Sequence, residues 1–221
     1  MEAKYDKLSK GFDLLAPFYD VLCLCSSGKV LSNSQRTFLG ELLSCKRALL
    51  IGGGTGGFLV DLLDACPELE IVSLDISFQM HEQSKAKILK LGADIRRVEF
   101  VQGSIEQFSF CNEFDLVITN YYLDLYTTSE LSEKVKFINK ALTQNALWLF
   151  TDFNDQVLGM RKHLFRIVIG ALYLPFRLLT GIETKRLPDF ETVFGEYPLE
   201  QTKVQYYLFG LLQAKLFKKI Y

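Results

Sequence analysis

The sequence has few of the residues that mark disulfide-rich, fibrous or metal-binding proteins. Its five cysteines are an odd and scattered set, and five prolines with fifteen glycines in 221 residues are too few for a linker or collagen. Cys23 and Cys25, the only close pair, are separated by one residue rather than the two or more usual for zinc ligands. We therefore expect reduced, mostly buried cysteines and no metal site.

Long hydrophobic runs are also absent. The most apolar stretch, Ile167–Phe176, lies between Arg166 and Arg177 and is shorter than the roughly 20 residues that a membrane-spanning helix needs. The first residues mix acids with lysines and contain no apolar segment typical of a secretory signal. These features predict a cytoplasmic protein.

Neither sign of charge is in excess: the sequence has 25 Lys and Arg and 26 Asp and Glu, and its formal net charge is −1. This balance argues against a general nucleic-acid binder, so we expect no nucleic-acid partner. The distribution is uneven, however: residues 157–221 hold ten Lys or Arg and five acids. An anionic partner or surface is therefore expected to face the C-terminal part.

The chain has enough apolar residues for a sizeable core, at 49% hydrophobic against 23% charged. Short β-rich runs alternate with longer helical ones, which is the pattern of a parallel α/β sheet. Strands are predicted at Ala48–Ile51, Ile71–Leu74, Val98–Val101, Phe114–Thr119 and Ala146–Phe150, and helices at Phe58–Ala65, Met80–Leu91 and Ser129–Leu142. The hydroxyl of Ser129 is expected to cap the last of these helices.

Two more β-rich runs, Thr202–Leu208 and Leu212–Tyr221, follow about 40 intervening residues. The short link between the two runs contains Phe209 and Gly210. So short a link joins antiparallel strands, because parallel neighbours need a crossover of a dozen or more residues. The prediction is a single α/β domain: a Rossmann-like three-layer α/β/α sandwich with a seven-stranded, mostly parallel sheet and an antiparallel last strand.

A glycine cluster directly follows the first predicted strand and precedes the first predicted helix. Gly52, Gly53, Gly54, Gly56 and Gly57 lie within six residues. Glycine permits positive φ and close approach of a ligand, while the start of a helix offers unpaired N–H groups. The cluster therefore predicts a loop that binds a nucleotide or nucleoside.

Asp75 ends the second predicted strand, 23 residues after Gly52. A carboxylate at this place lies beside the loop and can accept hydrogen bonds from both ribose hydroxyls. The loop alone does not decide between NAD and another adenosine cofactor. Gly52, Gly54 and Gly57 give the G-x-G-x-x-G pattern of dinucleotide binders, whereas Gly52, Gly54 and Gly56 give the pattern G-x-G-x-G.

Further segments resemble the class I S-adenosylmethionine-dependent methyltransferases. The matching segments are Ile51-Gly52-Gly53-Gly54-Thr55-Gly56, Leu74-Asp75-Ile76-Ser77, Val101-Gln102-Gly103-Ser104-Ile105-Glu106 and Phe114-Asp115-Leu116-Val117-Ile118-Thr119-Asn120, in the order of that family. Phe12-Asp13-Leu14-Leu15-Ala16-Pro17-Phe18-Tyr19-Asp20 is similar to the opening of quinone-type C-methyltransferases. The resemblance implies one methyltransferase domain over residues 1–221, with a helical cap (1–44), a cofactor-binding core (45–155), a helical lid or insert (156–195) and a β-hairpin (196–221).

The resemblance also implies the cofactor, S-adenosylmethionine, its product S-adenosylhomocysteine, and the residues that bind them. Gly52, Gly53, Gly54 and Gly56 would lie under the methionine and ribose, Asp75 would hold the ribose, Ile76, Ser104 and Ile105 would surround the adenine, and Asn120 and Tyr121 would face the sulfonium end. The expected activity is direct methyl transfer to a small, hydrophobic acceptor.

Methyl transfer needs alignment of the nucleophile with the methyl group, and a base where the nucleophile carries a proton. The leading candidates for positioning or base are Tyr19, Tyr121 and Asp152. Weaker candidates are Tyr122, Asp124 and His163. The simpler interpretation of Tyr122 is a packed aromatic residue, that of Asp124 a solvated residue on a surface helix, and that of His163 an ordinary surface histidine.

The segment Val157–Leu179 is apolar on nearly all sides from Leu164 to Leu174 and carries Arg161, Lys162, Arg166 and Arg177. A helix of this kind must be covered. Three interpretations stay open: a lid over a hydrophobic substrate, a homodimer contact, or a peripheral membrane contact.

Two other functions stay open at this point. An NAD(P)-binding Rossmann oxidoreductase fits the glycine loop, although no tyrosine is followed four positions later by the lysine that short-chain reductases use. A non-catalytic methyltransferase-like interaction protein is the other, because Leu50 and Ser104 stand where the family often has acids.

Overall fold

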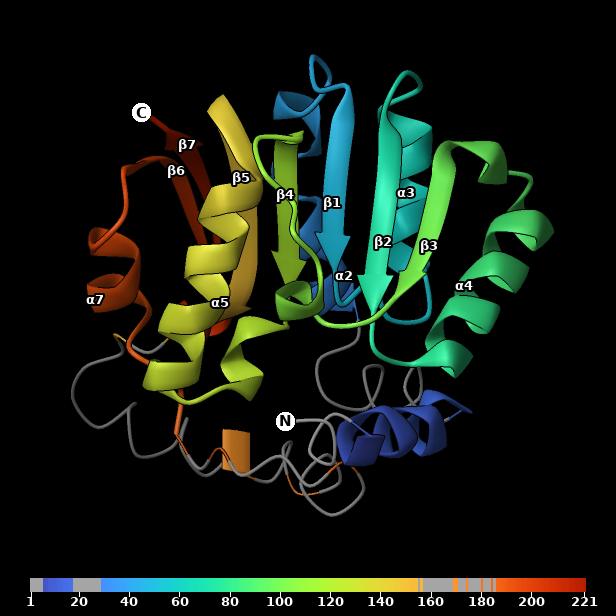
Figure 1. Ribbon diagram of the computed structural model, residues 1–221, viewed down its shortest axis with the longest axis horizontal. Helices are drawn as coiled ribbons and strands as arrows, with labels where there is room; N and C mark the ends of the chain where they lie inside the picture. The colour runs from blue at the N-terminus through green and yellow to red at the C-terminus, as the bar shows by residue number, and fades with distance from the viewer. Residues whose placement is uncertain are drawn as a thin grey trace.

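The structure is a computed structural model that describes residues 6–17, 29–154, 156, 169–170, 174, 180, 184 and 186–221. Its centre is one seven-stranded sheet with the order β3-β2-β1-β4-β5-β7-β6 (Figure 1). The strands are β1 (Arg47–Ile51), β2 (Glu70–Asp75), β3 (Val98–Gln102), β4 (Phe114–Asn120), β5 (Leu142–Phe153), β6 (Leu199–Tyr207) and β7 (Leu212–Lys219). The neighbours among β1 to β5 pair in parallel, and β7 pairs antiparallel with both β5 and β6.

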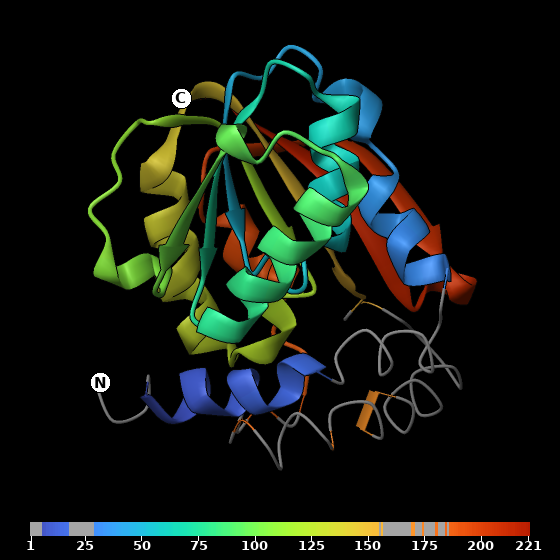
Figure 2. The same ribbon diagram turned by 90° about the vertical axis from the view of Figure 1, so that its right-hand side faces the viewer.

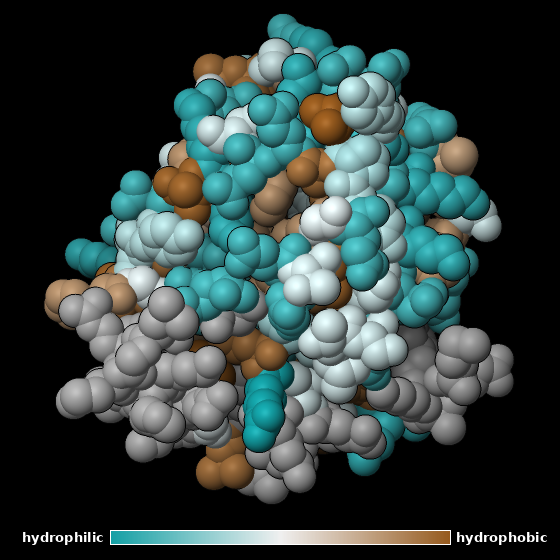
Figure 3. Space-filling view, turned by 90° about the vertical axis from the view of Figure 1, so that its left-hand side faces the viewer, coloured by the Kyte–Doolittle hydropathy of each residue, from teal (hydrophilic) through white to brown (hydrophobic). Residues whose placement is uncertain are grey.

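The predicted fold class is confirmed, including the antiparallel last strand. That strand is not at the edge of the sheet, because β7 lies between β5 and β6 and leaves β6 outermost. Strand β6 carries Glu200 and Lys203, and Figure 3 shows mainly hydrophilic residues with isolated apolar ones on the side of the molecule that bears α7 and β6. Charges on an outer strand oppose pairing with other chains.

Helices cover both faces of the sheet (Figure 1). They are α2 (Lys29–Arg36), α3 (Gly57–Ala65), α4 (Phe78–Leu91), α5 (Thr128–Ala141) and α7 (Phe190–Gly195), with short 3-10 turns η1 (Leu39–Glu41), η2 (Ile95–Arg97), η3 (Ile105–Gln107), η4 (Leu123–Leu125) and η5 (Leu208–Gly210). Residues 6–17 form a further helix. Among the described residues, none of the helices has the length and apolarity needed to cross a membrane.

Two cores lie on opposite faces of the sheet, because successive side chains of a strand point to opposite faces. In β1, Leu49 and Ile51 belong to the core that also contains residues of α5 and α7. Ala48 and Leu50 belong to the core that contains residues of α3. A strand that is buried on both faces reads as a continuous apolar run, which is why the sequence predicted it correctly.

Helix ends follow local capping chemistry. The Ser77 side chain accepts a hydrogen bond from Met80 N at the start of α4, and Gly92 ends that helix in the left-handed conformation. The predicted cap of α5 is wrong: Thr127, not Ser129, caps the helix in a reciprocal pair with Glu130. The pattern of a Thr followed three residues later by Glu satisfies two backbone N–H groups at once and so outcompetes an isolated serine.

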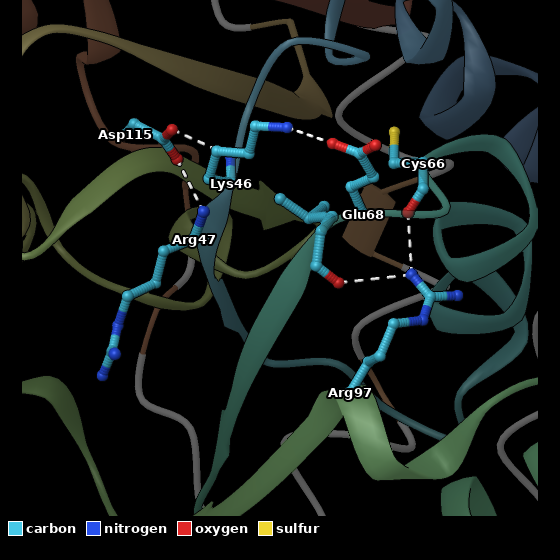
Figure 4. A network of polar contacts seen from close by, with 7 residues as sticks. Lys46, Arg47, Cys66, Glu68, Arg97 and Asp115 are labelled. Atoms are coloured by element: carbon cyan, nitrogen blue, oxygen red, sulfur yellow. Dashed lines mark hydrogen bonds and ion pairs between the residues drawn. The ribbon is translucent and has the colours of Figure 1, made fainter.

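The amino ends of the strands are held by structural contacts (Figure 4). The Asp115 carboxylate accepts hydrogen bonds from Lys46 N at 2.8 Å and Arg47 N at 2.9 Å. Arg97 donates to the carbonyls of Leu63 at 2.7 Å, Cys66 at 2.8 Å and Leu69 at 3.2 Å, where α3 has ended and its carbonyls lack helical partners. The polar groups at this edge are thus engaged in holding the fold together.

Of the cysteines, Cys45 and Cys66 are buried thiols and Cys111 is exposed. Burial raises the pKa of Cys45 to about 12, so this thiol is unreactive at neutral pH. Cys23 and Cys25 lie outside the described residues.

Candidate functional site

A cleft lies at the carboxyl ends of the parallel strands, with about 540 Å³ of space when the open solvent at its mouth is included. It is lined by Phe12, Ile51, Gly52, Gly54, Leu74, Asp75, Ile76, Met80, Gly103, Tyr121, Tyr122, Leu125 and Tyr126. Open α/β sheets bind their ligands at this edge. Five residues predicted from the sequence therefore meet in one cleft: Gly52, Gly54, Asp75, Ile76 and Tyr121.

The glycine loop has the conformation that only glycine adopts easily. Gly52, Gly54 and Gly56 have φ of 70°, 56° and 82°. Gly56 also packs tightly, since a Cβ there would lie 2.3 Å from Ser84 Oγ, whereas a Cβ on Gly57 would meet nothing within 4 Å. Of the two glycine patterns that the sequence left open, the loop's conformation and packing therefore require G-x-G-x-G.

Asp75 lies against this loop at the end of β2. Its carboxylate accepts hydrogen bonds from Gly54 N at 3.3 Å and from Ser77 N at 3.0 Å. Burial, with a smaller contribution from the nearby charge of Asp13, raises the pKa of Asp75 to about 6 against the lowering effect of those N–H groups. The carboxylate is thus ionised at neutral pH and has oxygen lone pairs left for a ligand's hydroxyl groups.

The helix at residues 6–17 closes one side of the cleft, lying across the carboxyl edge of the sheet below the start of α4 (Figure 2). Asp13 accepts hydrogen bonds from Ser77 Oγ at 2.6 Å and from Gln79 N at 3.1 Å. Ser9 Oγ donates to the Ile76 carbonyl at 2.8 Å. These contacts place Phe12 in the wall of the cleft, next to the residues that follow Asp75.

Three tyrosines, Tyr121, Tyr122 and Tyr126, form another wall of the cleft. Tyr121 has φ of 51°, which is uncommon for a bulky side chain, and its hydroxyl lies 2.6 Å from Ser34 Oγ of α2. Tyr122 packs on the loop, because a Cβ on Gly52 would lie 2.8 Å from its ring. Burial, followed by the proximity of Tyr126, raises the pKa of Tyr122 well above its ordinary value. Tyr122 is therefore a neutral packing group rather than a base.

Tyr126 contacts a partly buried ion pair between Lys134 and Glu106. Lys134 Nζ lies 2.5 Å from Glu106 Oε1 and 4.5 Å from the centre of the Tyr126 ring. Burial alone would raise the pKa of Glu106, but the charge and hydrogen bond of Lys134 lower it below its ordinary value. The aromatic wall therefore has a charged support that faces away from the cleft lining.

Asp152 and Asp124 lie behind this wall, not in it. Asp152 is fully buried and accepts hydrogen bonds from Phe153 N at 2.8 Å and from Asp124 N at 3.2 Å. Burial, followed by the charge of Asp124, raises the pKa of Asp152 well above its ordinary range. The expectation of a solvated Asp124 is wrong, since it is 2% exposed in η4. The geometry supports Asp152 as a residue that holds η4 rather than one that touches a ligand.

The other predicted residues that the structure describes are not among those that line the cleft. Gly53 and Gly56 lie within the loop, Ser104 begins η3 directly after Gly103, Ile105 is 1% exposed in the core, and Asn120 is buried at the end of β4. Tyr19 and His163 lie outside the described residues.

Several lining residues were not predicted, among them Phe12, Met80 and Tyr126. Phe12 belongs to the N-terminal motif that the sequence analysis singled out, so that motif was the available signal. Met80 lies in the first turn of α4, five residues after Asp75, where a side chain can turn back over the carboxylate. Tyr126 carries no comparable signal in the sequence.

The residues present fit a nucleoside cofactor. The loop exposes its backbone without side chains, Asp75 offers an anionic acceptor, and Ile76, Met80 and Phe12 offer apolar surfaces beside it. Hydroxyl groups of a ribose can bind the carboxylate while a flat base packs between the apolar side chains.

Comparison with known proteins agrees with this geometry. Residues 48–145 match the model of a family described as methyltransferase domain. Demethylmenaquinone methyltransferase of Deinococcus radiodurans is 27% identical over 215 residues, covering 86% of this chain and 87% of that protein.

Solved structures show the same fold. The mitomycin 7-O-methyltransferase MmcR superimposes with a TM-score of 0.67 at 16% identity; the match covers 87% of this chain but only 54% of MmcR. The N-methyltransferase NodS from Bradyrhizobium japonicum WM9, in complex with S-adenosyl-L-homocysteine, has a TM-score of 0.59 at 14% identity over 86% of both chains. These likenesses concern the fold. The family match shows that residues 48–145 are a methyltransferase domain, and with the strand order and the loop beside Asp75 it identifies this domain as the class I S-adenosylmethionine-dependent type.

Proposed function

We propose that the enzyme methylates a small, hydrophobic acceptor with an aromatic or quinone-type ring. The observation that carries this proposal is the composition of the cleft beyond Asp75, where Leu125, Tyr121, Tyr122 and Tyr126 form the wall. Among the described residues that line the cleft there is no Lys or Arg to receive an anionic acceptor. The name of the Deinococcus relative, a demethylmenaquinone methyltransferase, agrees with an acceptor of this class.

The glycine loop and Asp75 would hold the cofactor. Asp75 would accept hydrogen bonds from the ribose hydroxyls, and Ile76 and Met80 would pack against the adenine. S-Adenosylmethionine supplies a methyl group on a sulfonium that is already an activated electrophile. The protein's contribution is therefore to hold the acceptor in line and to exclude water, which a wall of fixed aromatic rings accomplishes.

Tyr121 is the residue best placed to orient the acceptor. Its backbone N–H donates to the Thr151 carbonyl at 2.8 Å and its hydroxyl contacts Ser34, so both ends of the residue are fixed. The neutral Tyr122 beside it cannot accept a proton readily at neutral pH. An acceptor that ionises easily, such as a phenol or quinol, fits this site, because it needs alignment more than a base.

Formation of S-adenosylhomocysteine from two classes of acceptor tests the proposal. We expect turnover with a naphthoquinol that has a free ring position and turnover at least about tenfold slower with a malonyl thioester, because the carboxylate would be desolvated without a partner. Tyr121→Ala should lower kcat/KM for the quinol by about tenfold or more. Equal rates with both acceptors, or turnover with the malonyl thioester alone, would overturn the assignment.

The contact between Asp13 and the start of α4 should control cofactor retention. Asp13→Ala removes the acceptor of two hydrogen bonds that hold the N-terminal helix and Phe12 in place. We expect S-adenosylhomocysteine to bind about three- to tenfold more weakly, mainly through faster dissociation, because part of the about 1 kcal/mol that each hydrogen bond contributes is lost from the ligand-bound state.

Asp6→Ala is the matched control for this change. Asp6 is on the same helix and forms an ion pair with Lys10 at the exposed surface. Surface-plasmon or stopped-flow dissociation rates should be unchanged in this control. A dissociation rate for Asp13→Ala equal to that of Asp6→Ala would show that the helix does not retain the cofactor.

A further inference from the structure

The turn between β6 and β7 presents an aromatic side chain in an unusual way. Leu208, Phe209 and Gly210 all have positive φ, of 48°, 57° and 94°. Bulky residues are disfavoured in this region, where glycine or asparagine is usual. Phe209 is nevertheless 84% exposed, more than the other exposed large hydrophobic residues of the described chain. Packing within the domain does not explain a phenylalanine at this position.

The turn is held firmly although its tip is exposed. Asn154 donates from Nδ2 to the Gly210 carbonyl at 2.9 Å and from its backbone N–H to the Leu211 carbonyl at 2.8 Å. Leu208 and Leu211 pack in a small apolar cluster with Val30 and Leu187, among others. The flanking residues therefore carry the packing, and Phe209 projects beyond it.

The turn lies at the same edge of the sheet as the cofactor cleft. Strand β7 begins opposite the end of β5, since Leu212 pairs with Phe153. Tyr121 and Leu125 of the cleft wall belong to the same apolar cluster as Leu208 and Leu211. A surface that contacts Phe209 would therefore lie close to the acceptor end of the cleft.

Positive charges accompany the turn. Two exposed cations, Lys29 and Arg186, immediately precede Val30 and Leu187 in the sequence. Val30 and Leu187 pack in the apolar cluster that contains Leu208 and Leu211. Ile169 packs in the same cluster, while Arg161, Lys162, Arg166 and Arg177 of the segment Val157–Leu179 lie outside the described residues. Aromatic and cationic side chains together suit the boundary between acyl chains and anionic headgroups.

We propose that this turn docks the enzyme on an anionic lipid surface, with Phe209 in the headgroup boundary and Lys29 and Arg186 toward the lipid phosphates. Docking there would orient the acceptor end of the cleft toward the lipid phase. The contact does not depend on methyl transfer, so it can be tested separately from the proposed function.

Tryptophan emission gives a direct test, because the only native tryptophan, Trp148, is fully buried. Phe209→Trp adds an exposed reporter at the turn. Its emission should shift to the blue with phosphatidylcholine vesicles that contain phosphatidylglycerol and not with phosphatidylcholine alone. Tyr221→Trp is the matched control, since Tyr221 is 80% exposed beyond the end of β7 at the opposite edge, and its emission should not shift.

Vesicle co-sedimentation measures the contribution of the native residue. Phe209→Asn keeps a residue that tolerates the left-handed backbone and should bind the anionic vesicles at least about fivefold more weakly, whereas Tyr221→Asn should bind as the wild type does. An unchanged melting temperature and unchanged S-adenosylhomocysteine binding would show that both variants are folded. Absence of wild-type binding, equal binding of Phe209→Asn, or a dimer in light scattering that Phe209→Asn dissociates would overturn the proposal.

Discussion

Asp75→Asn is expected to weaken S-adenosylhomocysteine binding about 30- to 150-fold at neutral pH, a loss of about 2–3 kcal/mol. The variant keeps the shape of the side chain but replaces an anionic acceptor, to which ribose hydroxyls donate, with a neutral amide. Isothermal titration calorimetry measures this loss.

NAD should not raise the melting temperature of the wild type, whereas S-adenosylhomocysteine should.

The pKa of about 6 for Asp75 gives this prediction a pH signature. Only the ionised carboxylate accepts both hydrogen bonds, so wild-type affinity should fall by up to about tenfold per pH unit below pH 6. Asp75→Asn should show little pH dependence over the same range.

The ionised Asp75 carboxylate should destabilise the free enzyme at neutral pH. Because the folded-state pKa lies above the unfolded value, the folded protein binds more protons, and stability falls as pH rises from about 4 to about 6. Asp75→Asn removes this loss and should stabilise the free protein by about 1–3 kcal/mol at neutral pH. Thermal unfolding of the free and ligand-bound forms would show a more stable variant that gains less from the ligand.

Asp64→Asn provides the control, since Asp64 is an exposed acid near the end of α3. It should change neither the affinity nor its pH dependence. If Asp75→Asn bound S-adenosylhomocysteine within about threefold of the wild type, the carboxylate would not hold the ribose.

The part of the site that sequence could predict is the part that local rules determine. A buried strand followed by Gly52, Gly54 and Gly56 requires a strand, a loop of positive φ and a helix in succession. The end of the next strand must then lie beside that loop, because β1 and β2 are parallel neighbours, so the position of Asp75 followed from the same pattern. Both predictions depend on residues close together in the chain.

The remaining features depend on contacts between distant segments. Asp124 looked like a surface residue because an aspartate on a helix is usually solvated, but η4 folds over β5 and the backbone N–H of Asp124 donates to Asp152. Phe12 reaches the cleft only because Asp13 meets the start of α4, 64 residues away in sequence from Ser77. The place of β7 inside the sheet likewise depends on pairing with β5, which the hairpin sequence alone does not specify.

Gly56→Ala is expected to destabilise the enzyme by about 3 kcal/mol or more and to abolish cofactor binding. Gly56 has φ of 82°, which alone disfavours alanine by about 1–2 kcal/mol. The added Cβ would also lie 2.8 Å from the Cα of the buried Ser84, so α3 and α4 must separate, and overpacking of this kind adds about 1–3 kcal/mol. Chemical denaturation and calorimetry with S-adenosylhomocysteine measure the two effects.

Gly57→Ala is a matched control one residue away. Gly57 is exposed at the first position of α3 and has no atom within 4 Å of an added Cβ, so alanine should be neutral or stabilise the helix by up to about 1 kcal/mol. The pair separates the two glycine patterns: a dinucleotide loop would depend on Gly57, whereas this loop depends on Gly56. If Gly57→Ala lost cofactor binding while Gly56→Ala kept it, the loop would have to be reassigned to the dinucleotide pattern.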